Sequence, residues 1–343
     1  MNSPIVSVAQ LIVGIAVLYW GAEWLIRGSA AVARAFGVKP LVIGLTVVAY
    51  GTSAPELAVA TKTALTHHQP IALGTVIGSC AANISLILGL TALISPPTID
   101  GRIIRRDVPV LLGSVIVVPI LFRNGVLSHV EGYVLIACAV VFTIVTLTVS
   151  SRLERDDEIV SLEPGVRDAD AEDAAFTTAR AEESGAIGGR AHPRASRGLA
   201  TVMTVFGLAL LLLGSNFFVN GGRALAGTIG MSERMLGLTV ISLGTSLPEL
   251  IGSIVAASRG QSALAVRSVI GSNLMNVFLV LGVTASLREI RLGERMHLVD
   301  LIGLVAITLL GVLMMRGSRR ISRFEGGILV AAYVAFIVCC AIL

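Results

Sequence analysis

The sequence predicts an all-α membrane protein with ten transmembrane helices in two inverted-topology five-helix repeats. Three observations lead to this fold class. Of the 343 residues, 55% are hydrophobic and 14% are charged, whereas about 25% of a typical soluble domain is charged. Apolar stretches of about 20 residues, the length that crosses a hydrocarbon core, recur along the chain. The two halves also carry copies of one sequence segment, which begin five spans apart.

Ten apolar stretches are candidates for the membrane spans, and the fourth is the shortest of them. They cover residues 5–25, 41–61, 71–93, 107–122, 129–149, 199–219, 236–257, 263–286, 297–315 and 325–343. A chain of this kind has the lipid bilayer as its main solvent, and each span is expected to be a helix because a helix satisfies its own backbone hydrogen bonds.

The basic residues predict how the chain is oriented. The formal net charge is +4, but Lys and Arg in membrane proteins concentrate in cytoplasmic loops, so this charge does not indicate a nucleic-acid partner. If the N-terminus is outside, ten spans place about 19 of the 26 Lys and Arg residues inside. We therefore expect an integral multi-pass protein of the plasma (inner) membrane, with both termini outside and the 151–198 loop in the cytoplasm.

The interruption of the apolar pattern at residues 151–198 predicts three parts in the chain. Residues 1–150 form the first five-helix repeat, and residues 199–343 form the second. The segment between them is acidic, rich in Ala and Gly and poor in aromatic residues, which is typical of a mobile linker.

A calcium-sensing loop is a less favoured interpretation of this linker. Asp168, Asp170 and Glu172 offer alternating carboxylates like the first three ligands of an EF-hand loop. However, Asp173 occupies the position that requires Gly, and Ala179 replaces the bidentate Glu.

The internal repeat is the most informative feature of the sequence. Residues 21–93 and 214–286 align without a gap at an offset of 193, with about 27 of 73 positions identical. GLTVVAYGTSAPEL at 44–57 returns as GLTVISLGTSLPEL at 237–250. Because an odd number of crossings separates the copies, they run in opposite directions through the membrane. This is the plan of many secondary transporters, which bind substrate at the midplane where the repeats meet.

Two carboxylates at equivalent positions of the repeat are the main candidates for function. Glu56 and Glu249 lie deep in predicted spans, where a charge costs about 2.5 to 3.5 kcal/mol even on the most lenient scale. Each follows two hydroxyl residues at i−4 and i−3, and residues at this spacing share a helix face. These hydroxyl residues are Thr52 and Ser53 in the first copy and Thr245 and Ser246 in the second.

These oxygens are suited to a hard cation. Ca2+ takes six to eight oxygen ligands at about 2.3 to 2.6 Å, and neither copy alone supplies that number. Pro55 and Pro248 lack an N–H and break the preceding helical turn, so the carbonyl groups of Gly51 and Gly244 lose their usual partners. Such carbonyl groups are tolerated in a membrane when they line a cavity or bind an ion. We therefore expect a kinked helix in each copy and a Ca2+ site between the copies.

A second pair of polar positions follows the same pattern with neutral side chains. Ser79 and Asn83 are four residues apart, as are Ser272 and Asn276. Small residues around them would allow close helix packing. Alone they would indicate either packing or ligands, but their recurrence beside the Glu pair favours the ligand interpretation.

The same residues resemble a known family. GTSAPE and GTSLPE, followed by GSCAAN and GSNLMN, look like the alpha-1 and alpha-2 motifs of the calcium/cation antiporters, specifically the prokaryotic type of the sodium/calcium exchanger branch. Here these motifs span residues 44–93 and 237–286, and the resemblance covers about 290 residues.

The resemblance implies a Ca2+ antiporter driven by Na+, with Ca2+ and Na+ as transported ions and no organic cofactor. It also implies that the first and sixth spans slide against the other eight during alternating access. The ligands it implies are Glu56, Glu249, Thr52, Ser53, Thr245, Ser246, Ser79, Asn83, Ser272 and Asn276, with the backbone carbonyl groups of Ala49 and Ser242.

The sequence departs from this family at several places. Many exchangers have Asp where Asn276 stands, Asn where Cys80 stands, and Gly-Asn where Gly74-Thr75 and Arg267-Ser268 stand. The Asn276 change removes a third negative charge and leaves the ion stoichiometry open. Arg267 is interpreted first as a positive-inside residue and second as a gate or a substrate filter.

Four further polar side chains and the cysteines have simpler interpretations. Glu23 is one turn from Arg27, which predicts a salt bridge, and a metal site at His67 and His68 is the minor alternative for those residues. The four cysteines lie in predicted spans without metal-ligand spacing, so we interpret them as packing residues.

Other functions remain as alternatives. On the same fold, H+ could replace Na+ as the coupling ion, because buried carboxylates can take up protons. A cation channel would need a continuous pore and usually a symmetric oligomer. Paired carboxylates also occur in enzymes, but no nucleophile or metal cluster accompanies them here, so we expect no enzymatic activity. A monomer suffices for the site, and the oligomeric state is not predicted.

Overall fold

The computed structural model describes residues 4–36, 49–99, 101, 103–160, 197–258, 262–292, 298–317 and 319–342. The described chain is almost entirely helical, and a large buried core of aliphatic side chains joins its helices. The fold is therefore an all-α membrane architecture, as the sequence predicts.

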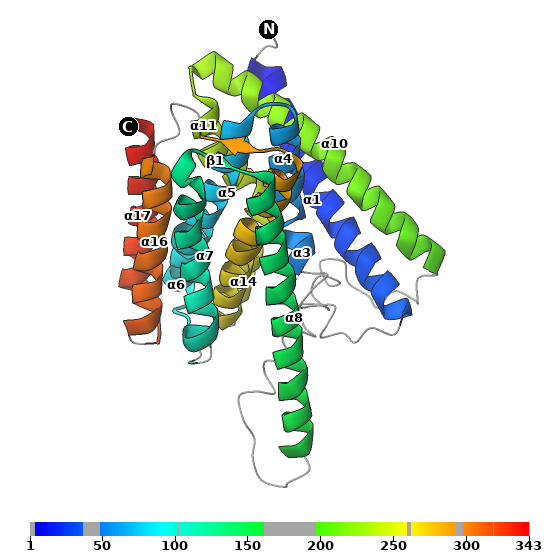
Figure 1. Ribbon diagram of the computed structural model, residues 1–343, viewed down its shortest axis with the longest axis vertical. Helices are drawn as coiled ribbons and strands as arrows, with labels where there is room; N and C mark the ends of the chain where they lie inside the picture. The colour runs from blue at the N-terminus through cyan, green and yellow to red at the C-terminus, as the bar shows by residue number, and fades with distance from the viewer. Residues whose placement is uncertain are drawn as a thin grey trace.

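Two long helices form one part of the molecule. Helices α1 (Pro4–Ala35) and α10 (Arg197–Ile229) pack against each other along their length. They lie antiparallel and slanted at one side of the molecule, as Figure 1 shows. Both are longer than the predicted spans at 5–25 and 199–219, which agrees with their tilt because a tilted helix needs more residues to cross a bilayer.

The other helices form the second part, which contains the core. From the first half come α3 (Ala49–Thr52), α4 (Ala54–Leu65), α5 (Gln69–Ala81), η2 (Ala82–Ile87), α6 (Leu88–Ile94), η3 (Ile103–Asp107), α7 (Val108–Leu121), η4 (Phe122–Asn124) and α8 (His129–Val160). From the second half come α11 (Glu233–Leu236), η5 (Gly237–Ile241), α12 (Ser242–Thr245), α13 (Leu247–Ser258), α14 (Ser262–Met275), η6 (Asn276–Leu281), α15 (Gly282–Leu287), α16 (Leu298–Gly317) and α17 (Arg323–Ile342).

One short antiparallel ladder closes an end of this core. Strands β1 (Val126–Leu127) and β2 (Ile290–Arg291) pair with Val126 opposite Arg291. The strands follow α7 and α15 respectively, so the ladder ties the two halves of the chain together above the helices (Figure 1).

The described part of the chain has seven helices that are long and apolar enough to cross a membrane, or eight if the bent pair α11–α12 and α13 counts as one span. Two predicted spans are not among them. The span at 41–61 lies partly outside the described residues, and the span at 107–122 contains α7, which has only 14 residues.

The two copies of the repeat adopt similar local structures. Continuous helices run through α5, η2 and α6 in the first copy and through α14, η6 and α15 in the second. In each, a π-helical segment begins within one residue of the candidate ligand asparagine, at Ala82 and at Asn276. A π-helical turn widens the helix by one residue and is frequent at functional sites.

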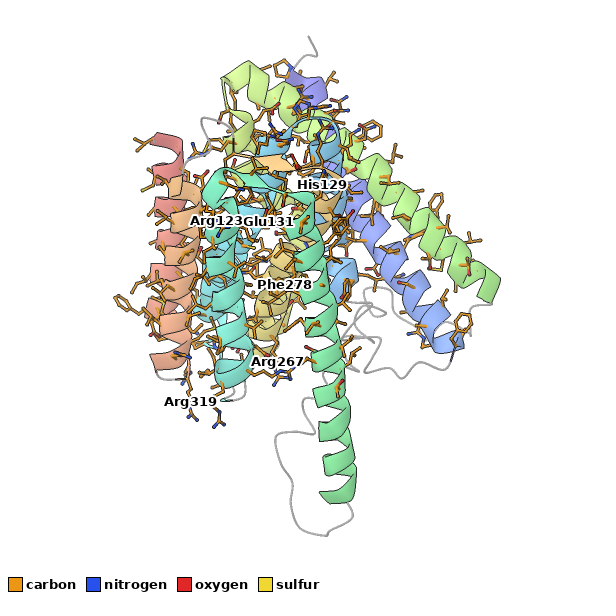
Figure 2. All side chains as sticks on the ribbon, in the orientation of Figure 1. Arg123, His129, Glu131, Arg267, Phe278 and Arg319 are labelled. Atoms are coloured by element: carbon orange, nitrogen blue, oxygen red, sulfur yellow. The ribbon has the colours of Figure 1, made fainter. Side chains whose placement is uncertain are left out.

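Three arginines labelled in Figure 2 lie at the ends of the helical core. Arg267 and Arg319, both predicted to be cytoplasmic, lie toward one end, while Arg123 lies at the other end of α7 (Figure 2). The start of α1 and the end of α17 point to the same end as each other (Figure 1).

The linker differs from the prediction at its beginning. Helix α8 continues to Val160 and projects beyond the other helices, so the first ten residues of the segment 151–198 are helical. Residues 161–196, with the carboxylates of the EF-hand-like run, lie outside the described residues.

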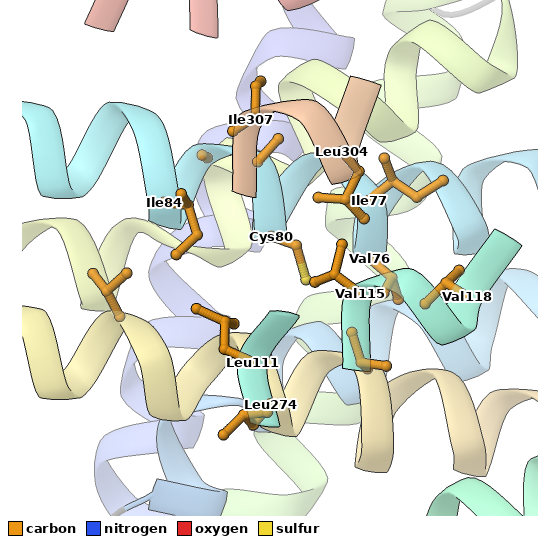
Figure 3. Packing of buried hydrophobic residues seen from close by; sticks show 14 of the residues in the cluster. Val76, Ile77, Cys80, Ile84, Leu111, Val115, Val118, Leu274, Leu304 and Ile307 are labelled. Atoms are coloured by element: carbon orange, nitrogen blue, oxygen red, sulfur yellow. The ribbon is translucent and has the colours of Figure 1, made fainter. Parts of the chain in front are cut away.

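Aliphatic side chains from several helices pack around the C-terminal part of α5. Figure 3 shows Cys80 among Ile77, Leu111, Val115 and Leu274, which come from α5, α7 and α14. Cys80 is fully buried, so this cysteine fills apolar space as the sequence suggests.

Candidate functional site

A helix break in each copy defines the site. Helix α3 ends at Thr52 and α4 begins at Ala54, with Ser53 between them. In the second copy, α12 ends at Thr245 and α13 begins at Leu247, with Ser246 between them, and the chain bends by 49° there. Pro55 and Pro248 lie at the start of the new helices, where the missing N–H costs nothing. Both helices are therefore interrupted where the sequence predicts kinks.

Each break places a carboxylate in the first turn of the following helix. Glu56 lies in the first turn of α4, and Glu249 lies in the first turn of α13. Both are buried, at 1% and 4% exposure. The partial positive charge of a helix N-terminus favours a carboxylate in this position, so each backbone segment would help to stabilise a negative charge on its carboxyl group in an apolar region.

The two copies meet at these carboxylates. The Ser246 hydroxyl donates to Oε1 of Glu56 at 3.0 Å, which joins the first copy to the second. The Thr245 hydroxyl also approaches the Glu56 carboxylate, and Glu249 is near enough for the two charges to interact. Oε2 of Glu56 is buried and has no hydrogen-bond partner within the described ranges.

A backbone carbonyl contributes a further shared point. The carbonyl oxygen of Ser242 accepts from the Ser79 hydroxyl at 3.4 Å, from the Thr245 hydroxyl at 3.1 Å and from the Ser246 N–H at 3.0 Å. Ser79 comes from α5 of the first copy, so this contact again crosses between the copies. The predicted ligand carbonyl of Ser242 therefore lies beside three other predicted ligands.

The asparagines form a second cross-copy contact. Asn83 on η2 donates from Nδ2 to Oδ1 of Asn273 on α14 at 2.9 Å. Oδ1 of Asn83 and Oδ1 of Asn276 are both buried and lack hydrogen-bond partners in the part of the chain that the structure describes. Buried amide oxygens are normally paired, so these two are suited to a bound cation.

The structure does not connect all the predicted ligands equally. Ser53 and Ser272 are buried, but neither makes a hydrogen bond to the other copy among the described residues. Thr52 is half-buried at the end of α3. Ala49 is the first residue of α3, and its side chain lies outside the described part of the structure.

The donor set is rich in neutral oxygen and contains two charges. Among the described residues no group of three or more His, Cys, Asp and Glu side chains could hold a metal. A cation here would therefore be held by two carboxylates together with hydroxyl, amide and carbonyl oxygens, which is the chemistry that Ca2+ and Na+ accept. No Lys or Arg of the described chain forms a salt bridge with Glu56.

Two buried polar features of the core are not predicted by the sequence. Arg234 and Asp300 form a buried two-contact ion pair, with Nε–Oδ2 and Nη2–Oδ1 distances of 2.7 and 2.6 Å. Asp300 lies near the edge of a predicted span. A single acidic residue beside an apolar run is the only sequence feature that could have indicated a buried ion pair. The second feature is the contact made by Asn273. The only sequence feature that could have indicated it is that Asn273 is equivalent to Cys80 in the repeat.

The remaining polar residues contact other side chains of the protein. Glu23 and Arg27 form the predicted salt bridge at 2.5 Å. His68 contacts Glu233 through Nδ1 at 2.8 Å, and His67 contacts Arg288 at 2.9 Å. The two histidines therefore have separate protein partners.

The sequence matches a known family over both halves. The model of the family described as sodium/calcium exchanger protein matches residues 6–148 and 199–341. The second match starts and ends 193 residues after the first (199 − 6 and 341 − 148), the offset of the internal repeat. The family model thus matches each copy once.

Individual relatives match nearly the whole chain. CaxA of Alkalimonas amylolytica is 32% identical over 335 residues, covering 97% of this chain and 98% of CaxA. Inner membrane protein YrbG of Escherichia coli is 32% identical over 283 residues, covering 82% of this chain and 80% of YrbG. The sodium/calcium exchanger MaX1 of Methanosarcina acetivorans is 29% identical over 351 residues, covering 96% of each.

A solved structure has the same arrangement of helices. The sodium-calcium exchanger NCX_Mj, soaked with Na+ and Sr2+, superposes with a TM-score of 0.62 at 29% identity, covering 98% of this chain and 99% of that one. With the family model matching most of the sequence, this chain belongs to the sodium/calcium exchanger family of membrane transporters.

Proposed function

We propose that this chain is a secondary-active antiporter that exchanges Ca2+ for Na+ at a site between Glu56 and Glu249. The observation that carries the proposal is the hydrogen bond from Ser246 to Glu56. It places oxygens of both copies around one buried carboxylate that retains an unpaired oxygen within the described chain. Uncompensated charge is costly in a bilayer, and a bound cation would remove that cost.

The proposed ligands are the residues at the two breaks, the asparagines of η2 and η6, and the serines one turn before them, Ser79 on α5 and Ser272 on α14. The hydroxyl and amide side chains of these segments would complete the Ca2+ and Na+ sites, and the carbonyl groups of Ala49 and Ser242 would add backbone oxygen. The carbonyl ends of α3 and α12 carry partial negative charge, so a cation is favoured there.

The proposed architecture is ten spans in two inverted repeats. The matching breaks, the matching π-helical segments and the double family match support a duplicated fold. In this proposal α1 and α10 move against the remaining helices, so that the site opens to each side in turn. Both termini would lie outside and the linker inside. Cysteines introduced at residues 3 and 343 should then react with impermeant thiol reagents on intact cells, and cysteines in the linker should not.

The names of relatives support Na+ as the coupling ion. MaX1 is a sodium/calcium exchanger by name, and NCX_Mj is a sodium-calcium exchanger whose structures were obtained in Na+, Ca2+ and Sr2+. The hydroxyl-rich oxygen set here resembles what such ions require.

The test is uptake of 45Ca2+ into proteoliposomes with Na+, K+ and pH gradients varied one at a time. The proposal expects uptake that depends on an outward Na+ gradient and is indifferent to the pH gradient. Uptake driven by a pH gradient alone would indicate H+ exchange on the same fold. Uptake without any opposing gradient would indicate a channel, and absence of uptake under all gradients would reject Ca2+ transport.

A further inference from the structure

Two candidate ligands, Asn83 and Asn276, stand at the same position of the repeat but have different neighbours. The residue three positions earlier is Cys80 in the first copy and Asn273 in the second. Both are fully buried. They also contact each other, because Nδ2 of Asn273 donates to the Cys80 carbonyl oxygen at 3.2 Å. The Cys80 Sγ in turn lies 4.0 Å from the Asn273 backbone carbonyl oxygen, so the two residues are joined by two contacts.

The amide of Asn83 has a fixed partner. Its Nδ2 donates to Oδ1 of Asn273 at 2.9 Å, and the bond from Asn273 to the Cys80 carbonyl determines which end of the Asn273 amide is the acceptor. If the Asn83 amide turned over, two carbonyl-type oxygens would face each other, and neither can donate. Oδ1 of Asn83 must therefore point away from Asn273.

The amide of Asn276 has no such fixed partner in the described chain. It lies within hydrogen-bonding reach of the Cys80 thiol, and a thiol is both a weak donor and a weak acceptor. The thiol hydrogen is directed at the Asn273 backbone carbonyl oxygen, with Sγ 4.0 Å from that oxygen, so only the sulfur is left as a weak acceptor for the Asn276 amide. Its Oδ1 is nevertheless buried without a hydrogen-bond partner among the described residues, like Oδ1 of Asn83.

We propose that Asn273 is a positioning residue, which orients the Asn83 amide so that its oxygen rather than its nitrogen faces the bound cation. The inference rests on the proposed function. The two halves of the site are then unequal: Asn83 is oriented by an amide hydrogen bond before the ion arrives, whereas Asn276 has only a weak contact with the Cys80 sulfur. Orientation before binding strengthens affinity because less freedom is lost on binding.

The substitution Asn273→Cys is the direct test, because it gives the second copy the residue that already stands in the first. The readout is the Kd for 45Ca2+ of the full-length protein in detergent, and its displacement by Na+. We expect the Kd to rise about three- to tenfold, the factor expected for one neutral hydrogen bond. In proteoliposomes the KM for Ca2+ should rise by the same factor, with little change in the maximal rate.

A double-mutant cycle separates positioning from a general structural role. In an Asn83→Ala background, residue 83 has no side-chain amide for Asn273 to orient. Asn273→Cys should then change the Kd by less than about twofold. Thr284→Val is the control for the loss of a buried hydrogen bond away from the ligands, because the Thr284 hydroxyl donates to the Val280 carbonyl oxygen of its own helix at 2.6 Å, and it should leave the Kd within about twofold. Asn273→Ala also removes the Oδ1 acceptor of Asn273. This variant is used in the same measurements if Asn273→Cys does not fold.

The outcomes distinguish this inference from the proposed function. If the wild-type protein binds no 45Ca2+, the proposed function and the positioning role both fail. If the wild type binds Ca2+ but Asn273→Cys and Asn273→Ala bind it equally well, only the positioning role is overturned. An equal loss of affinity in the Asn83→Ala background would also overturn it, because the effect would then not pass through Asn83.

Discussion

The contact between α1 and α10 and the contact of this pair with the rest of the molecule are built differently. Along α1 and α10, glycines face the backbone of the opposite helix. A Cβ on Gly21 would lie 2.8 Å from the Leu211 nitrogen, and a Cβ on Gly221 would lie 2.8 Å from the Leu11 nitrogen. Each helix has three such glycines spaced by seven residues, so they fall on the same face. They are Gly14, Gly21 and Gly28 on α1 and Gly207, Gly214 and Gly221 on α10.

The pair contacts the site through side chains instead. Gly51 of α3 faces the Ile26 side chain of α1, and Gly244 of α12 faces the Phe218 ring of α10. These glycines are equivalent in the repeat, and each precedes a candidate ligand threonine. Where two helix backbones touch at glycines, the helices cannot slide along each other without a clash. Where a side chain packs against a glycine, the side chain can change rotamer and the helices can shift. In the proposed transport cycle, relative motion would therefore occur at the second contact, one residue from the proposed ion site, while α1 and α10 stay together.

The largest expected effect comes from the carboxylates of the core. Glu56→Gln or Glu249→Gln should reduce Na+-driven Ca2+ exchange by at least about 100-fold, because each removes a charged ligand that neutral oxygens cannot replace. The proteins should still insert and fold, since Gln fits the same space. The measurement is 45Ca2+ flux with purified protein checked by gel filtration, and exchange close to the wild-type rate in either variant would reject the site.

The sequence singles out these carboxylates because the duplication marks them twice. A lone Glu in an apolar run could be a span edge, but Glu56 and Glu249 recur with the same hydroxyls and the same proline. The Asp300 carboxylate has no repeat partner, and Arg234 stands just before a predicted span. Their pairing joins α11 to α16, and no local pattern specifies a contact between residues 66 positions apart.

Other features were missed for different reasons. The π-helical segments have no composition of their own, because a π-helical turn arises where packing requires an extra residue. The seven-residue spacing of Gly14, Gly21 and Gly28 was visible in the sequence. It indicates a close helix contact, but the partner helix becomes evident only when the copies are placed side by side.

The second prediction tests how the core is held together. Asp300→Asn should lower the free energy of unfolding by about 3 to 5 kcal/mol, because it leaves the buried Arg234 guanidinium without its counter-charge. Thermal unfolding in detergent measures this. The pair Arg234→Met with Asp300→Leu should recover most of the loss, since apolar replacement of both partners is often neutral.

An exposed ion pair provides the control for that experiment. Arg291 and Glu289 are 3.5 Å apart at the surface, and Glu289→Gln should cost no more than about 1 kcal/mol. If Asp300→Asn lowers the free energy of unfolding by no more than Glu289→Gln does, the buried ion pair does not hold α11 to α16.

The third prediction concerns the backbone contact between α1 and α10. Gly221→Ala should destabilise the protein by about 1 to 3 kcal/mol, because the new methyl group meets backbone that cannot move aside. Gly227 lies on the same helix, and a methyl group there would have no neighbouring atom of the described chain within 4 Å. Gly227→Ala should therefore be neutral or stabilising by up to about 1 kcal/mol. Equal melting temperatures for the two variants would refute the close contact.

The smallest expected effect tests the contact between Gly244 of α12 and Phe218 of α10, where we expect relative motion during transport. In Gly244→Ala the new methyl group overlaps the Phe218 ring, but the ring belongs to a side chain and can turn. Stability should therefore fall by less than in Gly221→Ala. If α10 must move past Gly244 in each transport cycle, the maximal exchange rate should fall roughly three- to tenfold, about 1 kcal/mol in the barrier. The Kd for Ca2+ should stay nearly constant because the ligands are unchanged.

Two further variants decide whether the Phe218 contact limits the movement of α10. Gly252→Ala on α13, where a methyl group would meet no atom of the described residues within 4 Å, is the matched control and should keep the wild-type rate. Phe218→Leu should restore the rate of Gly244→Ala, because the smaller side chain makes room for the methyl group. A slow Gly252→Ala variant, or a double variant as slow as Gly244→Ala, would show that this contact does not set the rate.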